Sequence, residues 1–583
     1  MERRTFLLAG AALAAAPSLP AVAVPSQRKA LPFLLYGPPV VTTDLRAWFE
    51  AMQQWGVTRW MAYPYLFHNR RDAYHGAIPF VGDDIPAFRR YLKSHPPVEQ
   101  EKILREQERL CATHGMDFWY MLPFPLFPAH DKKDAMEAMP ELFTNGRLKI
   151  SHPALPELMK KQVRSLKRTL PKLKGINIWF AEGAGTLAEI GAEELKTVEE
   201  WLPGLLRAFA DVTKECGLEG IVFAHNYLLT VAMRTRVYDV LALYPHMTVM
   251  EDITWPQEDA QHPFLGYLTA RQRRMLFRNP VATNFLLDTE YIGQGILPSV
   301  YPRWWKKNID ASIDAGVALG MGRVFFWDGG YTDVNFNRLN AHVYCRLCND
   351  PNADLHAVFT EAVREMFGVE VSPELIELLW QTEPVIKEAL GIHGIVSLDH
   401  TRFLPPVLLD RCYAGNRTPM SAVNDLFEAP GTKLYPQLTG ELNNLKQWRW
   451  QTQTVAKPAS VYLAAKNRAL RWLDDAILRV DKLSVDLRPQ HRELLRNGYR
   501  LLRAYTEGLK LVIEVADAHA RWAHRRTLKT KDAVVVFRAK AREFRELANE
   551  KIPENPLMLR ERLLDWAEFL EKIGDGPFMC AES

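Results

Sequence analysis

Acidic residues directly follow several short apolar runs in the first 330 residues of the sequence. Glu182 follows one run, Glu251 and Asp252 follow a second, Asp288 and Glu290 follow a third, and Asp328 follows a fourth. Cleavage of a glycosidic bond needs one protonated carboxyl group, which donates to the leaving oxygen. It also needs an ionised one, which attacks the sugar or activates a water. The recurrence of carboxyl groups after apolar runs therefore favours glycoside cleavage.

Glu182 is the candidate for the proton donor. It follows the apolar stretch 179–181, and desolvation by apolar neighbours raises the pKa of a carboxyl group. The glycine after it leaves room for close approach of a substrate. Glu290, together with Asp252 or Glu251, is expected on the other side of the site, where two carboxylates could hold a water between them.

A second set of polar and aromatic residues near the same runs could bind a sugar. Polar side chains bind hydroxyl groups, and aromatic faces stack on the C–H faces of sugar rings. The candidates are Glu251, His225, Asn226, Asp288, Tyr291, Trp255, Trp327, Asp328, Tyr331 and Arg70, with Trp304 and Trp305 as further aromatic residues. No His-x-His or His-Glu-x-x-His spacing is present, so we predict neither a metal nor a cofactor.

Each candidate also has a structural alternative. A single carboxylate could cap a helix or pair with an arginine such as Arg303 or Arg338. His225 could be satisfied in the rim of the fold, and the aromatic residues could fill the core. For the carboxylates, recurrence after four separate runs favours a shared site over four unrelated caps.

Eight apolar runs, separated by stretches with helical periodicity, are the elements that must position these residues. Such runs are typical of strands buried on both faces, and alternation with helices makes the sheet parallel. The expected strands are Phe33–Gly37, Thr58–Tyr63, Asp117–Leu122, Gly175–Ala181, Gly220–Ala224, Met247–Met250, Val281–Leu287 and Arg323–Trp327. Polar groups follow nearly every run, and no Gly-x-Gly-x-x-Gly follows the first. An α/β fold with a closed (β/α)8 barrel is therefore favoured over a doubly wound open sheet.

Helical stretches dominate after about residue 350. The expected helices are Leu355–Met366, Pro373–Leu390, Ser460–Leu483 and Gln490–Arg526, and the one strand-like run is Ala533–Phe537. A chain of this length exceeds what one core normally serves. We therefore predict a catalytic barrel at 30–345 and a mostly helical C-terminal domain at 346–583.

The first 23 residues have the pattern of an export signal. Arg3-Arg4 precede an alanine-rich apolar stretch that ends in the small-residue sequence Ala21–Ala23. The arginine pair resembles the twin-arginine type, which carries folded proteins across the bacterial inner membrane. The alternative is an uncleaved membrane anchor, for which the stretch is short. We predict a signal peptide at 1–23 and a periplasmic or secreted protein.

The overall charge and the cysteine content narrow the partners. The 73 basic and 69 acidic residues give a net charge of +4 without long runs of one sign, so nucleic acid and anionic membranes are not predicted partners. Six cysteines do not make a disulfide framework in a chain of this size. Cys345 and Cys348 form a lone Cys-x-x-Cys in a helical stretch, which favours buried thiols over a metal site. An oligosaccharide or polysaccharide is the expected partner, and the sequence does not indicate an oligomeric state.

At these motifs the sequence resembles the α-glucuronidases of glycoside hydrolase family 67, inverting enzymes with a barrel and a helical C-terminal domain. Ala181-Glu182-Gly183 is similar to the context of that family's acid after the fourth strand. Thr289–Gln294 matches the motif that carries one of its base carboxylates after strand seven, and Asp252-Ile253 is a weaker match to the aspartate after strand six. The resemblance covers about residues 170–370 and implies Glu182 as acid, with Glu290 and Asp252 positioning water.

Two departures from family 67 bear on the substrate. The family has a β-rich domain before the barrel, whereas here the first expected strand follows the signal almost at once. The lysines that hold the substrate carboxylate in that family have no counterpart before Glu182 or Asp252. Arg59, Arg70 or Arg303 could replace them, because a guanidinium group matches a carboxylate.

Three hypotheses follow from these residues. The first is an inverting exo-acting glycosidase on polysaccharide fragments, with an α-glucuronidase-like activity among the possibilities. The second is a retaining glycosidase that uses Glu182 and Glu290 alone, which needs a shorter separation of the two carboxyl groups. The third is a non-catalytic periplasmic carbohydrate-binding protein that has the same barrel.

Overall fold

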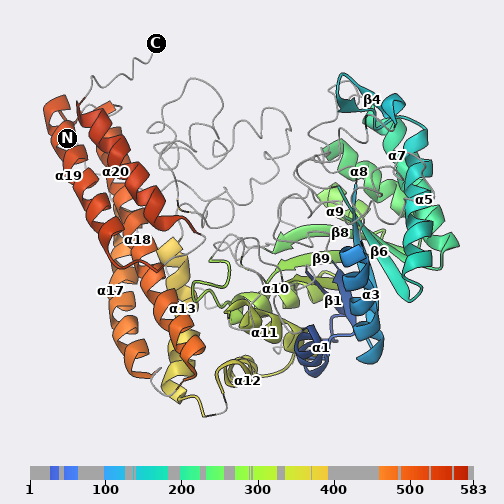
Figure 1. Ribbon diagram of the computed structural model, residues 1–583, viewed down its shortest axis with the longest axis horizontal. Helices are drawn as coiled ribbons and strands as arrows, with labels where there is room; N and C mark the ends of the chain where they lie inside the picture. Colours follow the sequence, from blue (N-terminus) through green and yellow to red (C-terminus); the bar gives the residue numbers. More distant parts are fainter. Residues whose placement is uncertain are drawn as a thin grey trace, which may run out of the picture.

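The structure is a computed structural model of the 583-residue chain. It describes residues 27–37, 45–62, 98–124, 136, 139–180, 197–223, 231–254, 270–287, 289, 293–324, 335–368, 370–390, 403, 459–483, 487–523, 527–553 and 557–575. Figure 1 shows two parts side by side, a barrel and a group of long helices, with α10 to α13 between them.

Eight parallel strands form a closed barrel, in agreement with the fold predicted from the sequence. The strands are β1 (Phe33–Gly37), β2 (Arg59–Ala62), β3 (Asp117–Phe124), β6 (Leu173–Phe180), β7 (Glu219–Phe223), β8 (Met247–Thr254), β9 (Val281–Leu286) and β10 (Leu319–Arg323). Each strand pairs with its neighbour in chain order, and β1 closes the ring by pairing with β10. The carboxyl ends of all eight strands therefore lie at one end of the barrel.

Helices surround the barrel and cover the outer face of its strands. They are α1 (Leu45–Gln54), α3 (Val98–Thr113), α5 (Ala154–Thr169), α7 (Val198–Glu215), α8 (Val231–Leu241), α9 (Ala270–Leu276), α10 (Pro302–Asp314) and α11 (Asn337–Asn349). Strand side chains alternate between two buried clusters, one shared with these helices and a smaller one inside the ring. The barrel is thus filled by side chains at its centre.

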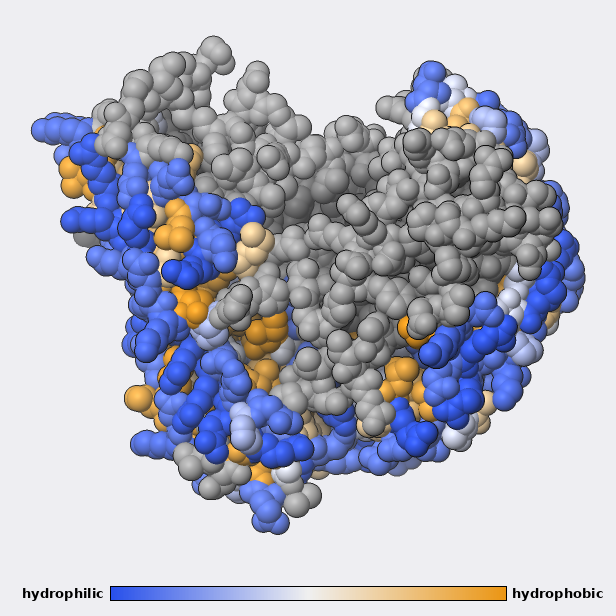
Figure 2. All heavy atoms as spheres, viewed as in Figure 1, coloured by the Kyte–Doolittle hydropathy of each residue, from blue (hydrophilic) through white to orange (hydrophobic). Residues whose placement is uncertain are grey.

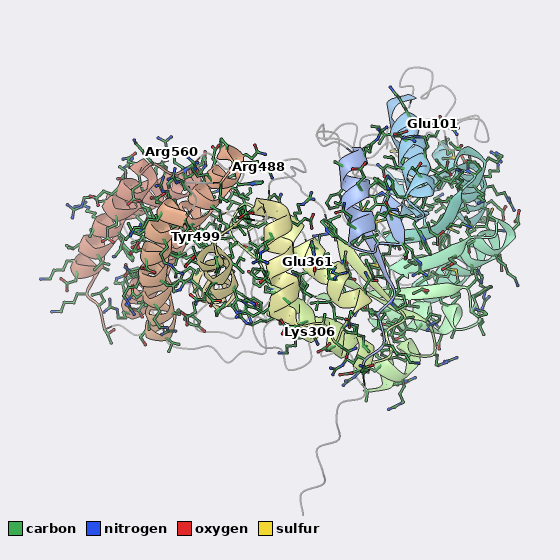
Figure 3. All side chains as sticks on the ribbon, turned by 90° about the horizontal axis from the view of Figure 1, so that it is seen from below. Glu101, Lys306, Glu361, Arg488, Tyr499 and Arg560 are labelled. Carbon is green, nitrogen blue, oxygen red and sulfur yellow. The ribbon has the colours of Figure 1, made fainter. Side chains whose placement is uncertain are left out.

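The remaining helices pack against one another beside the barrel and are called the bundle (Figure 1). They are α12 (Leu355–Phe367), α13 (Pro373–Leu390), α17 (Ala459–Leu483), α18 (Pro489–Ala523), α19 (Thr530–Asn549) and α20 (Leu559–Asp575). α13 contacts both α17 and α18, while α10 contacts α12 and α13. Figure 3 shows Glu361 on α12, between the barrel and the outer helices. The predicted boundary at residue 345 falls inside α11, and the division into domains stays a prediction.

The last barrel strand lies four residues earlier than the predicted strand Arg323–Trp327. β10 has the sequence Leu-Gly-Met-Gly-Arg, and its two glycines are more typical of a turn than of a strand. A Cβ on Gly320 would lie 2.4 Å from the Tyr344 hydroxyl, and one on Gly322 would lie 2.6 Å from Leu35. The glycines therefore let α11 approach the strand closely, which is their role in a strand interior.

Two further segments differ from the sequence-based expectations. The strand-like run Ala533–Phe537 is part of α19, where Ala533 and Phe537 are buried one turn apart and Val535 between them is exposed. A small hairpin, β4 (Phe143–Thr144) and β5 (Arg147–Leu148), was not expected. Its Asn-Gly turn has positive φ at both residues, which is the signal for a tight hairpin.

The outer faces of the described helices are mostly hydrophilic, as Figure 2 shows for both the barrel side and the bundle side. Among the described residues, no helix combines the length and the apolar character needed to cross a bilayer. Cys345 and Cys348 are free thiols buried in α11, and burial raises the pKa of both. These two cysteines are core residues, in line with the interpretation of the Cys-x-x-Cys spacing as buried thiols.

Candidate active site

The interior of the barrel has an apolar base and polar side chains in its wall. The apolar members are Leu34, Met61, Trp119, Met121, Ile221, Phe223, Met250, Ala282, Leu319 and Met321. Tyr36 of β1 belongs to the same cluster, and its hydroxyl donates to the Asn284 side chain of β9 over 2.7 Å. This bond joins β1 to β9 inside the barrel. Because Tyr36 and Asn284 are both buried, it is shielded from solvent.

Asn177 is a second buried amide inside the barrel. It lies on β6, three residues before the strand ends at Phe180, and has no exposed surface. Its Nδ2 lies 3.6 Å from the sulfur of Met250, and its Oδ1 has no hydrogen-bond partner among the described residues. Buried polar atoms are nearly always paired in folded proteins, so this oxygen is suited to accept a bond from a bound molecule or water.

Arg323 adds a cation to the same end of the barrel. It is the last residue of β10, lies opposite Tyr36 in the ladder and is partly buried. Met321, two residues earlier on the strand, belongs to the interior cluster. Strand alternation therefore gives Arg323 the inward register at the carboxyl end.

The Glu251 side chain lies on the outer face of β8, toward α8 and away from the barrel interior. It lies within β8, not after it, and is fully buried. The Tyr238 hydroxyl of α8 donates to its carboxylate, and Arg234 is buried one turn earlier on the same helix. Burial raises the pKa of Tyr238 well above its usual value, and the Glu251 charge adds to this effect. Glu251 therefore joins β8 to α8, and its predicted role in binding substrate stays a prediction.

Asp252 is the next residue of β8. Its backbone lies opposite Asn284 in the ladder with β9, beside a register shift between Asp252 and Thr254. Its side chain lies outside the described part of the structure. The strand register nevertheless sets Asp252 next to β9, the strand that leads to Glu290.

The segment after β9 has an unusual backbone. Thr289 and Gln294 have φ values of 51° and 50°, and Gly293 and Gly295 also have positive φ. For a β-branched residue such as Thr289 this conformation is rare, and such strain costs about 1–3 kcal/mol. Thr289 is nevertheless almost completely buried. Surrounding contacts must therefore compensate for the strain.

Most of the predicted site residues lie outside the described residues. These are Glu182, Glu290, His225, Asn226, Asp288, Tyr291, Trp255, Trp327, Asp328, Tyr331 and Arg70. Their places in the chain relative to the observed strands are nevertheless known. Glu182 comes two residues after the end of β6, and Glu290 comes four residues after the end of β9.

Four residues considered in the sequence analysis have other roles. Trp304 and Trp305 of α10 are core residues, not sugar platforms. Arg303 lies 3.9 Å over the Trp380 ring and contacts Glu383, so it does not replace the missing lysines. Arg59 begins β2, at the end of the barrel opposite the carboxyl ends of the strands.

Sequence reasoning missed Tyr36, Asn177, Asn284 and Arg323. The sequence pattern indicates residues that follow each apolar run, whereas these four residues lie within the strands. A polar residue at an inward position of an apolar strand was the available signal. Among the described residues, no group of three or more His, Cys, Asp or Glu side chains gathers as a metal site would.

Comparison with known proteins was informative at the level of structure. No family model matches the sequence, and no curated protein matches it. A solved GH138 enzyme targeting pectin rhamnogalacturonan II superposes with a TM-score of 0.56 at 14% identity, covering 94% of this chain and 85% of that one. The chain shares its fold. This likeness agrees with the predicted (β/α)8 barrel, and it does not single out family 67.

Two other structures align with TM-scores below 0.5, and we draw no conclusion from them. One is a mutant O-GlcNAc hydrolase from Thermobaculum terrenum, with a TM-score of 0.43, 11% identity and coverage of 94% of each chain. The other is a GH115 4-O-methyl-α-glucuronidase with specificity for decorated arabinogalactans. Its TM-score is 0.46 at 9% identity, with 92% of this chain and 62% of that chain covered.

Proposed function

We propose that the protein is an exported glycoside hydrolase that acts on oligosaccharides derived from plant polysaccharides. The proposal rests on the places of three carboxylates in the chain relative to the barrel strands. Glu182 follows β6, Asp252 lies near the end of β8 and Glu290 follows β9, all at the carboxyl ends of strands in one closed parallel barrel. Barrel enzymes carry their catalytic residues at this end.

The polar part of the barrel interior supports a sugar ligand. Tyr36, Asn177 and Asn284 are buried beneath this end, and a sugar presents hydroxyl groups that both donate and accept hydrogen bonds. The shared fold with an enzyme that targets a pectic polysaccharide favours a plant cell-wall fragment as substrate. For an α-glucuronidase-like activity, Arg323 at the end of β10 and Arg70 are the candidate partners of a uronic acid carboxylate.

We assign the general acid to Glu182 and the positioning of water to Glu290 with Asp252. β8 and β9 are adjacent strands, and adjacent strands lie about 4.8 Å apart, so carboxyl groups from these two strands can share one water. With a water held between these two carboxylates, the proposed mechanism is inverting. The proposed action is exo. A retaining mechanism would use Glu182 and Glu290 alone.

The first test replaces the carboxyl groups one at a time. Glu182→Gln and Glu290→Gln should each lower kcat/KM on pectic oligosaccharides by about 10²–10⁴-fold, because proton transfer contributes by this amount. Glu219→Gln is the matched control, since this exposed carboxylate begins β7 at the far end of the barrel and should leave activity unchanged. Full activity of Glu182→Gln would remove the assigned acid.

The anomer released first, followed by NMR, separates the two mechanisms. Inversion of configuration is expected, and retention would replace the water-positioning pair with a nucleophile. Binding of the same oligosaccharides without any turnover in the unmodified protein would instead indicate a carbohydrate-binding protein.

A further inference from the structure

The described residues of the segment from Thr289 to Ser299 form hydrogen bonds with one another and with α11. The Gly295 amide donates to Thr289 Oγ1 over 2.9 Å, and the Gln294 amide donates to the Thr289 carbonyl over 2.9 Å. These two bonds tie together both ends of the stretch that contains Glu290. The chain before and after Glu290 is therefore fixed by Thr289.

Thr289 is in turn fixed by α11. Its hydroxyl donates to Asn337 Oδ1 over 2.8 Å, so the oxygen of Thr289 takes part in two bonds at once. The Phe336 amide, at the start of α11, donates to the Gly295 carbonyl over 3.0 Å. Thr289, Asn337 and Gly295 are all buried. Because no water competes for these bonds, they define one backbone conformation.

A second asparagine of α11 holds the far end of the segment. Asn340 lies one turn after Asn337, and its Nδ2 donates to the Ser299 carbonyl over 2.9 Å. Its Oδ1 accepts the Tyr301 amide and the Trp305 indole. The described residues Thr289, Gly295, Ser299 and Tyr301 are therefore all held by α11 or the residue before it.

The bundle also touches this segment. Gly498 lies in the interior of α18, and a Cβ placed there would be 2.8 Å from the Ile296 carbonyl oxygen and 3.1 Å from the Phe336 ring. Glycine is unfavourable inside a helix, so its presence at this contact indicates that close approach matters. α18 therefore packs directly against Ile296 and the start of α11.

We propose that Thr289, through Asn337, and Gly498 of the bundle are positioning residues for the carboxyl group of Glu290. This inference rests on the proposed function, in which Glu290 positions water. Thr289 directly precedes Glu290, and a strained, buried residue whose hydroxyl and carbonyl groups are both hydrogen-bonded fixes the direction in which the chain leaves it. The helical domain thereby contributes to catalysis through its contact with the segment after β9.

The test compares three variants with matched controls. Thr289→Val keeps the shape of the side chain and removes both hydroxyl bonds, so kcat should fall at least tenfold with KM within about twofold, and the acidic limb of the pH profile should move. Thr289→Ser keeps the hydroxyl and should restore most of the activity. Gly498→Ala should also lower kcat, whereas Gly204→Ala, in α7 with no atom within 4 Å of the new Cβ, should not.

The outcomes separate this inference from the proposed function. If Glu290→Gln is inactive while Thr289→Val and Gly498→Ala keep normal kcat and pH profiles, the positioning role is wrong and the proposed function stands. If Glu290→Gln is fully active, the proposed role of Glu290 fails first. Circular dichroism and thermal unfolding of each variant show that a loss of kcat occurs in a folded protein. If the loss of kcat in Thr289→Val is matched by a loss of folded protein, a specific positioning role for Thr289 is refuted. Failure of Thr289→Ser to restore activity would refute it as well.

Discussion

Glu365 of α12 shows how one carboxylate can connect several elements. It accepts hydrogen bonds from the Trp55 indole after α1 and from Arg338 of α11, each over 2.7 Å, and it is bonded to His342. Burial by itself would raise the pKa of Glu365, but the bond and charge of His342, followed by Arg338 and Trp55, together lower it to about 2. The ionised form is thus strongly favoured in the folded state.

This lowered pKa predicts a stability that depends on pH. The contribution of Glu365 should be present above its ordinary value of 4.5 and should be lost as the pH falls toward 2. Glu365→Gln should therefore lower the free energy of unfolding by about 2 kcal/mol at pH 7, and by progressively less below pH 4.5. Urea unfolding at several pH values measures the difference.

The control for this prediction lies one turn earlier on the same helix. Glu361 is half-exposed, and its two oxygens lie 3.4 Å from the partly exposed Arg346 and 3.6 Å from His342. Glu361→Gln should change stability by less than about 0.5 kcal/mol at any pH. A constant difference between the unmodified protein and Glu365→Gln from pH 7 to pH 3 would contradict the assigned pKa.

At the residue scale, the sequence predicted less than at larger scales. Glu251 and Asp252 are adjacent in the sequence, but strand alternation gives them opposite registers, and Glu251 faces α8. Whether both residues belong to β8 decides on which face each side chain lies. The apolar content of the sequence does not show that the strand continues to Thr254. Arg303 and Arg338 were considered as partners of the candidate carboxylates, but in the structure they pair with Glu383 and Glu365, which belong to later helices.

At the scale of elements, the start of α10 depends on α13. Oε1 of Glu383 accepts the Trp304 amide over 2.9 Å, and Oε2 accepts the Arg303 amide over 3.1 Å. The Trp380 carbonyl has no i+4 amide partner, because residue 384 is proline, and the Arg303 guanidinium donates to it over 3.0 Å. One helix thus caps another, and the arginine compensates for the proline.

This cap predicts a measurable loss of stability. Glu383→Ala should lower the free energy of unfolding by about 2 kcal/mol, since it leaves one buried and one partly buried amide of the first turn without an acceptor. Glu383→Gln keeps one oxygen in place and should cost less. Denaturant midpoints of the two variants test this order, and equal losses would show that the charge and not the acceptor matters.

The elements themselves were largely predictable. Seven of the eight expected strands match the observed ones closely, because runs such as Phe33–Gly37 and Val281–Leu287 are apolar and rich in strand-forming residues. The eighth shares only Arg323 with β10. The eighth was misplaced because the close packing of Gly320 and Gly322 against Tyr344 is a tertiary effect. The valines within Ala533–Phe537 were misleading for the same reason, since helix packing overrides the intrinsic preference of β-branched residues.

At the scale of the molecule, the barrel and the bundle are joined through α10 to α13 (Figure 1). The sequence predicted both parts, because a change from alternating strands and helices to helices alone is visible without any structure. It did not predict that α18 would contact the segment after β9. Such a contact depends on Gly498 and Ile296, which are about 200 residues apart and show no pattern in common.

The predicted export signal can be tested on the whole chain. Replacing Arg3 and Arg4 together by lysine should stop export and leave full-length precursor in the cytoplasm, because the twin-arginine receptor reads that pair. Replacing Arg273 and Arg274, an exposed pair in α9, by lysine is the control and should leave export normal. Cell fractionation with sequencing of the mature N-terminus measures both. Normal export of the first variant would favour a different signal.

The pairing of β1 with β10 has a consequence for how the chain folds as it is synthesised. Phe33 pairs with Gly320, so the first strand cannot gain its second neighbour until more than half of the chain has left the ribosome. Such a non-local closure slows folding and leaves a strand edge uncovered in the meantime. A route that transports the completed fold would let the ring close in the cytoplasm, before the protein reaches a compartment without the same chaperones.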